Sequence, residues 1–140
     1  GGQGYQGYRA YARSKLAMIM ATYALARRLE GTGVTANAVH PGFVATSLYS
    51  HLGCISLVLK PLFKLVAKSP EEGAATVVYL AASPDVAGLS GKYFIDCRAA
   101  ESSPESYDKD GQRRLWRMSM EMIGLAGEER DVAEPTINER

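Results

Sequence analysis

Residues 31–42 read GTGVTANAVHPG, and the order of helix end, strand and turn in this stretch decides the fold class. The stretch follows residues 8–30, which contain no Gly or Pro and are rich in strong helix formers. Its first glycine favours a left-handed helix cap, and Val34–Val39 predicts a short buried strand. Pro41 and Gly42 end that strand, because Pro cannot donate to a strand ladder and Gly turns the chain. A helix, a short loop and a strand form half of a βαβ unit, so we expect an α/β fold.

The expected helix over residues 8–30 has two apolar faces. One is a stripe of large side chains at helical spacing, formed by Leu16, Ile19, Met20 and Tyr23. The other is a face of small residues, formed by Ala17, Ala21 and Ala24. We expect one face to pack on a sheet. The small-residue face allows close approach of a second helix or of a second subunit in a homo-oligomer.

Two more regular elements are predicted downstream. Ser69 followed by Pro70 and two glutamates is typical of a helix start, with Ser as the N-cap and acids in the first turn. This helix is expected over Pro70–Ala82. Its core-facing residues are predicted to be Ala74, Val77, Val78 and Ala81. A strand is expected over Lys92–Asp96.

The other segments are less regular. Leu48–Lys68 is apolar but broken by glycine and proline, which predicts one or two short amphipathic helices. Ala99–Gly111 is polar and is expected to be irregular, whereas Gln112–Gly124 has the pattern of a last helix. Residues 126–140 are charged and contain a proline, so we expect a disordered tail.

The composition excludes several functional classes. The chain has 140 residues, and 16 basic against 15 acidic side chains give a net charge of +1, which argues against a nucleic-acid partner. No run of about 18 uncharged apolar residues predicts a membrane-spanning helix. Cys54 and Cys97 match no metal-site spacing, and with no leader pattern the expected location is the cytoplasm. Because the chain starts with Gly, we expect it to be a segment of a longer protein.

Tyr11 and Lys15 are the residues that best fit a catalytic role. They are four positions apart on the expected helix and therefore point the same way. An ammonium near a phenol stabilises the phenolate and lowers its pKa from about 10. A tyrosine of that kind can pass a proton to or from a substrate oxygen near neutral pH. The alternative is an ordinary surface Tyr–Lys pair.

The surrounding residues favour the catalytic interpretation. The string YARSKLA at residues 11–17 is followed by the two-faced helix and then by HPGFVAT at residues 40–46. Together with GKYF at residues 91–94 and RLW at 114–116, this order resembles the second half of a short-chain dehydrogenase/reductase. The resemblance extends over residues 8–125 and is strongest to the retinol-dehydrogenase-like branch. It implies the carboxyl-terminal part of one Rossmann-type, doubly wound parallel sheet over residues 1–125, without the first strands.

The resemblance also implies roles for individual residues. Tyr11 corresponds to the family's acid/base, and Lys15 to the lysine that holds the nicotinamide ribose and lowers the pKa of the tyrosine. The cofactor, NADP or NAD, is expected to meet four further residues: Pro41, Gly42, Val44 and Thr46. From the residues alone, the Pro-Gly pair fits a plain strand-ending turn and Thr46 fits a helix N-cap.

Residues 48–68 correspond in position to the family's substrate loop. Many of their side chains are apolar, which predicts a pocket for an apolar alcohol or carbonyl compound of retinoid-, aldehyde- or steroid-like character. Core packing or contact with a membrane surface is an equal alternative.

The family's Gly-rich phosphate loop and catalytic Ser have no counterpart before Tyr11. Two interpretations follow. In the first, the chain is part of an NAD(P)-dependent oxidoreductase and is inactive alone. In the second, it is an inactive, truncated domain whose two-faced helix binds a partner.

Overall fold

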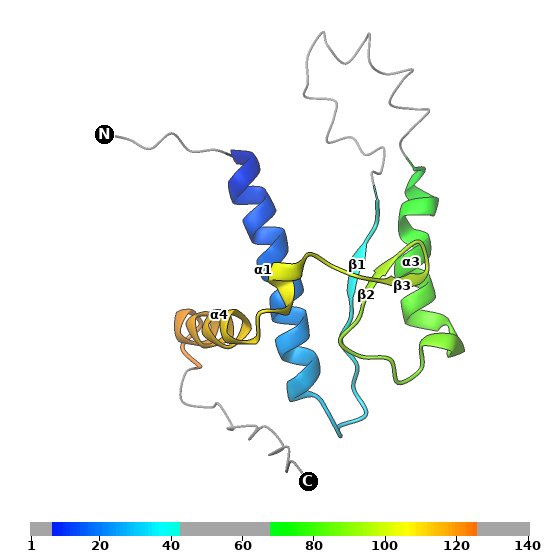
Figure 1. Ribbon diagram of the computed structural model, residues 1–140. Coiled ribbons are helices and arrows are strands. Elements are labelled where there is room, and N and C mark those ends of the chain that lie inside the picture. The colour runs from blue at the N-terminus through cyan, green and yellow to red at the C-terminus, as the bar shows by residue number, and fades with distance from the viewer. Residues whose placement is uncertain (1–6, 43–67, 126–140) are drawn as a thin grey trace, which may run out of the picture. The chain divides into compact units, whose positions relative to one another are not determined.

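The computed structural model describes residues 7–42 and 68–125, which divide into two compact units. One unit contains the residues up to Ala36 and those from Ser103 onward. The other contains Asn37–Ser102. Figure 1 shows the elements of each unit by label. Each unit is described by itself below.

The first unit is built on a long helix, α1 (Gly7–Arg28), which confirms the helix expected at this place. Its last turn holds Arg27 and Arg28, cations that suit the negative end of the helix dipole. Gly31 follows at a φ of 77°, the left-handed conformation in which glycine has no side-chain clash. The helix therefore ends at Arg28, two residues before the predicted end, and the glycine cap follows as expected.

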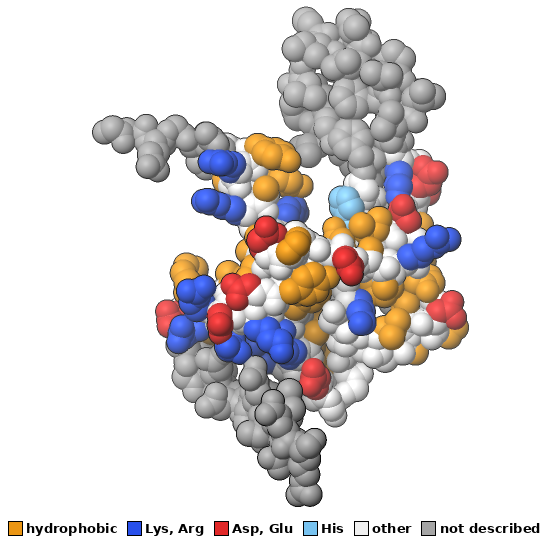
Figure 2. All heavy atoms as spheres, viewed as in Figure 1, with side chains coloured by type: hydrophobic (Ala, Val, Ile, Leu, Met, Phe, Trp, Pro, Cys, Tyr) orange, Lys and Arg blue, Asp and Glu red, His pale blue; other side chains and the backbone are white. Residues whose placement is uncertain are grey.

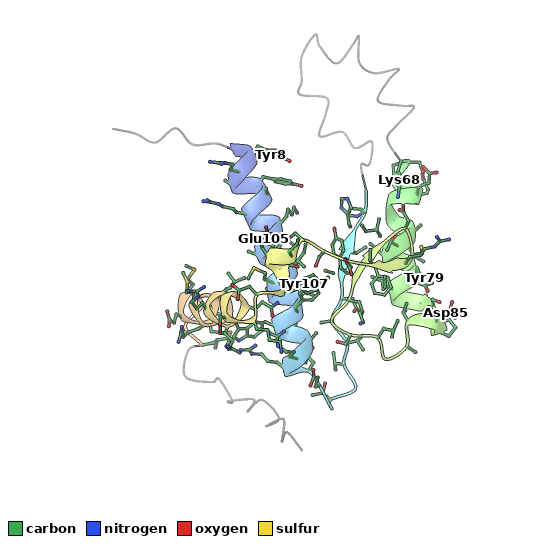
Figure 3. All side chains as sticks on the ribbon, in the orientation of Figure 1. Tyr8, Lys68, Tyr79, Asp85, Glu105 and Tyr107 are labelled. Carbon is green, nitrogen blue, oxygen red and sulfur yellow. The ribbon has the colours of Figure 1, made fainter. Side chains whose placement is uncertain are left out.

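Two shorter helices pack on α1 in this unit, η3 (Pro104–Tyr107) and α4 (Lys109–Met122). Figure 1 shows α4 running crosswise to α1. The Tyr107 ring stacks on Tyr23 of α1 with centroids 5.5 Å apart, and the Tyr107 label in Figure 3 lies against α1. Gly111 allows close approach, because a Cβ there would lie 2.9 Å from Cε of Met20.

The second unit has a three-stranded sheet in the order β1-β2-β3, made of β1 (Ala38–His40), β2 (Tyr93–Ile95) and β3 (Arg98–Ala100). β1 and β2 are parallel, with Val39 opposite Phe94, and α3 (Pro70–Ala82) lies between them in sequence and packs on β1. A short helix, η2 (Pro84–Val86), leads from α3 toward β2. Parallel strands linked through a helix are the βαβ pattern, so the expected α/β fold, a partial Rossmann-type sheet, is confirmed.

The strand expected over Val34–Val39 is shorter and later than predicted. β1 covers only Ala38–His40, because the preceding Asn37 bonds with its side chain. Its Nδ2 donates to the Leu89 carbonyl at 2.7 Å, and its Oδ1 accepts from the Lys92 amide at 3.0 Å. Asn37 therefore fixes the start of the parallel pair.

The third strand was not predicted. The sequence analysis expects irregular structure from Ala99, but Arg98–Ala100 pairs antiparallel with β2. Asp96 and Cys97 form the two-residue turn, with φ of 50° and 59°, as a type I′ turn requires. The prediction was wrong because neither residue is the glycine that usually marks such a turn.

The start of α3 is confirmed, but its predicted core face is wrong. Ser69 accepts from the Glu72 amide at 3.1 Å, and Glu72 accepts from the Ser69 amide at 2.7 Å, which together form a capping box. The buried residues of α3 are Gly73 and Thr76. All four residues expected in the core are exposed: Ala74, Val77, Val78 and Ala81. Apolar residues lie on more than one side of this helix, so periodicity alone does not choose the buried side.

Two expected segments lie outside the described residues. These are the short helices within 48–68, apart from Lys68 itself, and the tail over 126–140. The last helix is confirmed, but α4 begins at Lys109, three residues earlier than predicted. Asp108 caps it by accepting from the Asp110 amide at 3.0 Å.

Candidate functional site

Tyr11 and Lys15 lie together on the amino-terminal half of α1. The Lys15 Nζ is 5.5 Å from the centroid of the Tyr11 ring, as expected for neighbours one helical turn apart. Tyr11 is 61% exposed, and Lys15 is also exposed. The structure therefore brings the phenol and the ammonium side by side, with room for a ligand at the pair.

The charge around this pair has one sign. α1 contains no acidic residue, and its first turns hold Arg9 and Arg13, both exposed, in addition to Lys15. Figure 2 shows these turns with basic side chains gathered on them. Such a surface favours anionic ligands, of which a dinucleotide is one class.

Pro41 and Gly42 follow β1 in the second unit. They stand at the carboxyl end of a parallel strand, the place where open α/β sheets bind ligands. Gly42 has a φ of 78°, and a Cβ there would lie 3.2 Å from three atoms of the Lys68 side chain. The left-handed turn favours glycine at this position.

The same edge of the sheet holds an aromatic pair and an ion pair. His40 stacks on Tyr93 with centroids 6.4 Å apart, and burial raises the pKa of the Tyr93 phenol above its usual value of 10.0. Lys68 forms an ion pair with Asp96, which follows β2. The His40 ring thus contributes a stacking contact to Tyr93.

Within each unit, taken by itself, the residues expected to meet the cofactor have chemistry that suits a nicotinamide nucleotide. The Tyr11 phenol and the Lys15 ammonium can donate to ribose hydroxyls. The Pro41–Gly42 turn presents backbone groups at the carboxyl edge of the sheet, and Gly42 has no side chain to cover them. The other two residues expected to meet the cofactor, Val44 and Thr46, lie outside the described residues.

The sequence analysis did not identify three residues that hold elements together. Asn37 fixes the start of β1, Lys68 packs on Gly42, and Gln112 joins α4 to α1. Of these three, only Lys68 could have been singled out from the sequence. It directly precedes the helix cap at Ser69, and that helix start was predicted.

The small-residue face of α1 is partly covered within the chain. Ala24 has no exposed surface. Ala17 and Ala21 are half-buried.

The described part of the chain has neither a metal-binding cluster nor a helix that could cross a membrane. Residues 7–42 and 68–125 contain no cluster of three His, Cys, Asp or Glu side chains placed to hold a metal ion. Among the helices in these ranges, none has the length and apolar character needed to span a bilayer.

Comparison with known proteins finds similarity over most of this chain. The family model described as enoyl-(acyl carrier protein) reductase matches residues 1–96. Human retinol dehydrogenase 14 is 51% identical over 127 residues, covering 88% of this chain and 38% of the relative. Human retinol dehydrogenase 13 is 44% identical over 83% of this chain and 37% of its own length. Zebrafish (Danio rerio) polyprenol dehydrogenase is 44% identical over 86% of this chain and 38% of its own length.

The chain thus spans somewhat more than a third of the length of these relatives. The order of the motifs matches what the similarity implies. The chain belongs to the short-chain dehydrogenase/reductase family, in its retinol-dehydrogenase-like branch.

Proposed function

We propose that the chain supplies the Tyr–Lys half of an oxidoreductase that uses NADP or NAD and interconverts an apolar alcohol and its carbonyl compound. The observation that supports this most is the Tyr11–Lys15 pair, 5.5 Å apart and exposed on a helix without acids. Members of this family use nicotinamide cofactors. The other part of the nucleotide site is supplied, in this proposal, by residues that precede this segment in the full-length protein.

Tyr11 is the acid/base in this proposal. In the reductive direction its hydroxyl donates a proton to the carbonyl oxygen, and in the oxidative direction it removes the alcohol proton. Lys15 places a positive charge beside that phenol and donates to ribose hydroxyls. When bound, the cofactor supplies or accepts the hydride at C4 of its nicotinamide. In this proposal the backbone at Pro41 and Gly42 meets the nicotinamide edge.

The substrate class is supported by the relatives. Their names are retinol dehydrogenase and polyprenol dehydrogenase, and both alcohols are long and apolar. The apolar residues within 48–68 agree with this substrate class.

The decisive experiment replaces Tyr11 by Phe in the full-length protein. We expect kcat to fall by roughly 10²- to 10⁴-fold, the usual contribution of a general acid or base. NADPH binding, followed by nucleotide fluorescence, should persist because the ring remains. Tyr8→Phe is the matched control: Tyr8 is one turn earlier on α1 and 83% exposed, and its substitution should leave kcat unchanged. Full activity in Tyr11→Phe would contradict the proposal.

Two further measurements address cofactor and substrate. The 140-residue chain alone, titrated with NADPH and NADH, is expected not to bind, whereas the full-length protein is expected to bind one of them. A full-length protein that binds neither would favour the alternative of an inactive interaction module. A long aliphatic aldehyde should be turned over faster than a small polar ketone, and equal rates would exclude the apolar-substrate assignment.

A further inference from the structure

The Lys68 side chain lies directly over Gly42. A Cβ built on Gly42 would be 3.2 Å from Cδ, Cε and Nζ of Lys68. That is closer than ordinary van der Waals contact, so a side chain at position 42 would require the end of Lys68 to move by a few tenths of an ångström. The left-handed turn of Gly42, with a φ of 78°, is therefore covered by one neighbouring side chain.

Asp96 holds Lys68 in this position. Its Oδ1 accepts from the Lys68 ammonium in an ion pair whose side chains are partly exposed. Asp96 itself is fixed by the β2–β3 turn, because the amide of the next residue, Cys97, donates to Oγ1 of Thr76 at 3.2 Å. Thr76 is buried in α3, so the turn rests on a rigid helix. The contact at Gly42 is thus anchored through Asp96 to the rest of the unit.

These residues come from three segments that meet at one edge of the sheet. Gly42 follows β1, Asp96 follows the parallel β2, and Lys68 precedes the cap of α3. Figure 3 shows Lys68 at the amino-terminal end of α3. Because the ammonium is already neutralised by a carboxylate, the pair is not an anion site. Its physical effect is on the shape of the turn beneath it.

We propose that Lys68, fixed by Asp96, is a positioning residue for the nicotinamide cofactor, because it holds the Gly42 turn in the conformation that the cofactor meets. This inference rests on the proposed function and adds two residues to it, neither of which touches substrate. Loosening the pair lets Gly42 sample other conformations, which glycine does readily. Cofactor affinity then falls, whereas the chemical step at Tyr11 keeps its rate.

The test uses Lys68→Met and Asp96→Asn in the full-length protein. Met keeps most of the stem without the charge, and Asn tolerates the left-handed backbone of position 96. Each variant should raise the KM and the Kd for the nicotinamide cofactor roughly two- to fivefold, the range of a partly exposed ion pair, with kcat unchanged. The double variant should show no further increase, because both changes remove the same interaction. Lys68→Arg should restore most of the affinity.

A matched ion pair serves as the control. Arg113 and Asp110 form a similar partly exposed pair in α4, and Arg113→Met should leave the cofactor KM unchanged. Unchanged cofactor KM in Lys68→Met and Asp96→Asn would overturn the positioning role. So would additive effects in the double variant, or an equal loss of kcat and affinity.

The outcomes separate this inference from the proposed function. If the wild-type full-length protein binds no nicotinamide nucleotide, the proposed function and the positioning role fail together. If the wild type binds and the Lys68 and Asp96 variants bind equally well, only the positioning role fails. The Gly42 amide resonance in the 140-residue chain gives a readout without cofactor: it should shift equally in both single variants, and an unmoved resonance would overturn the inference.

Discussion

The Arg27 guanidinium on α1 donates a 2.5 Å hydrogen bond to Oε1 of Gln112 on α4. Gln112 is only 2% exposed, and its Nε2 donates in turn to the Ser106 carbonyl at 2.6 Å. One glutamine thus joins α1, η3 and α4. The neighbouring Arg28 guanidinium lies 4.3 Å from the ring of Trp116, which adds a cation–π contact at the same crossing. These contacts fix the carboxyl-terminal half of α1 and leave its amino-terminal half, with Tyr11 and Lys15, exposed.

Gln112→Ala should destabilise the first unit. The change removes the acceptor of the Arg27 bond and the donor to the Ser106 carbonyl, both in a buried place. We expect the free energy of unfolding to fall by about 1–3 kcal/mol, the cost of leaving such groups unsatisfied. Urea unfolding of the 140-residue chain, followed by the fluorescence of its single tryptophan, Trp116, measures this change.

Arg113→Ala is the matched control for that experiment. It lies next to Gln112 on α4 and pairs with Asp110 at the surface, so the expected change is at most about 0.5 kcal/mol. Equal effects of the two substitutions would mean that the buried bonds of Gln112 add nothing to stability.

The sequence predicted those elements whose signals are local. α1 follows from a long run without Gly or Pro, and the start of α3 follows from its serine, proline and glutamates. The strand expected over Lys92–Asp96 is also confirmed, as β2. The Tyr11–Lys15 contact needed only helical spacing, because residues four apart are neighbours on any helix.

The features that the sequence did not predict depend on distant partners. β3 requires the turn at Asp96 and Cys97, which is held by Thr76 of α3. Gln112 is a polar residue that sequence patterns place at the surface, yet it is buried by Arg27, 85 positions away. β1 starts late because the Asn37 side chain bonds to residues near 90. No local pattern contains such information.

Cys97→Gly should stabilise the β2–β3 hairpin. Cys97 has a φ of 59°, a conformation that costs an L-residue roughly 1–2 kcal/mol and costs glycine almost nothing. The hydrogen bond from the amide of residue 97 to Thr76 Oγ1 is kept. The substitution loses the weak contact of 3.9 Å between Cys97 Sγ and Thr76 Oγ1. After subtracting the greater chain entropy of glycine, we expect a gain of about 0.5–1 kcal/mol in unfolding free energy.

The comparison variant at this turn is Cys97→Val. A β-branched side chain is strongly disfavoured at positive φ, so this substitution should lower the free energy of unfolding. Thermal unfolding of both variants beside the wild type decides the matter. If glycine and valine shift the midpoint in the same direction, the left-handed backbone is not what limits the turn.

Lys15→Met should impair turnover in the full-length protein. The substitution keeps the aliphatic stem but removes the ammonium 5.5 Å from the Tyr11 ring and the donor proposed for the ribose hydroxyls. We expect kcat/KM to fall by roughly 10²-fold, within the range for a group that assists proton transfer. Lys15→Arg should recover part of this loss, because it restores the charge but not the compact geometry of the ammonium.

Arg13→Met is the control for the lysine. It removes a charge of the same sign, two residues earlier and on another side of α1, so steady-state kinetics should change little. A loss equal to that of Lys15→Met would show that the general positive field of the helix, rather than Lys15 itself, supports the reaction.

The loss of stability at acid pH should depend in part on Glu71, which lies in the first turn of α3. A hydrogen bond from its own backbone amide, followed by one from the Ser69 hydroxyl, holds the pKa of its carboxyl below the ordinary value of 4.5. Because the carboxylate is favoured in the folded state, its contribution is complete above pH 4.5. It is lost as the pH falls through the lower pKa of the folded state. Helix content by circular dichroism under partly denaturing urea should therefore fall as the pH is lowered from 5 toward 3.

Glu71→Gln separates the effect of Glu71 protonation on stability from the effects of other groups that bind protons at acid pH. Glutamine keeps an acceptor oxygen at the helix start but binds no proton in this range. The variant should be less stable than the wild type at pH 7, and the difference should shrink as the pH falls through the lowered pKa of Glu71. Ser69→Ala removes the hydroxyl that helps to lower the pKa of Glu71, so stability should depend less on pH in this variant. It should also lower the free energy of unfolding at every pH, because the helix cap is lost. A constant difference between Glu71→Gln and the wild type across this range would show that protonation of Glu71 is not linked to folding.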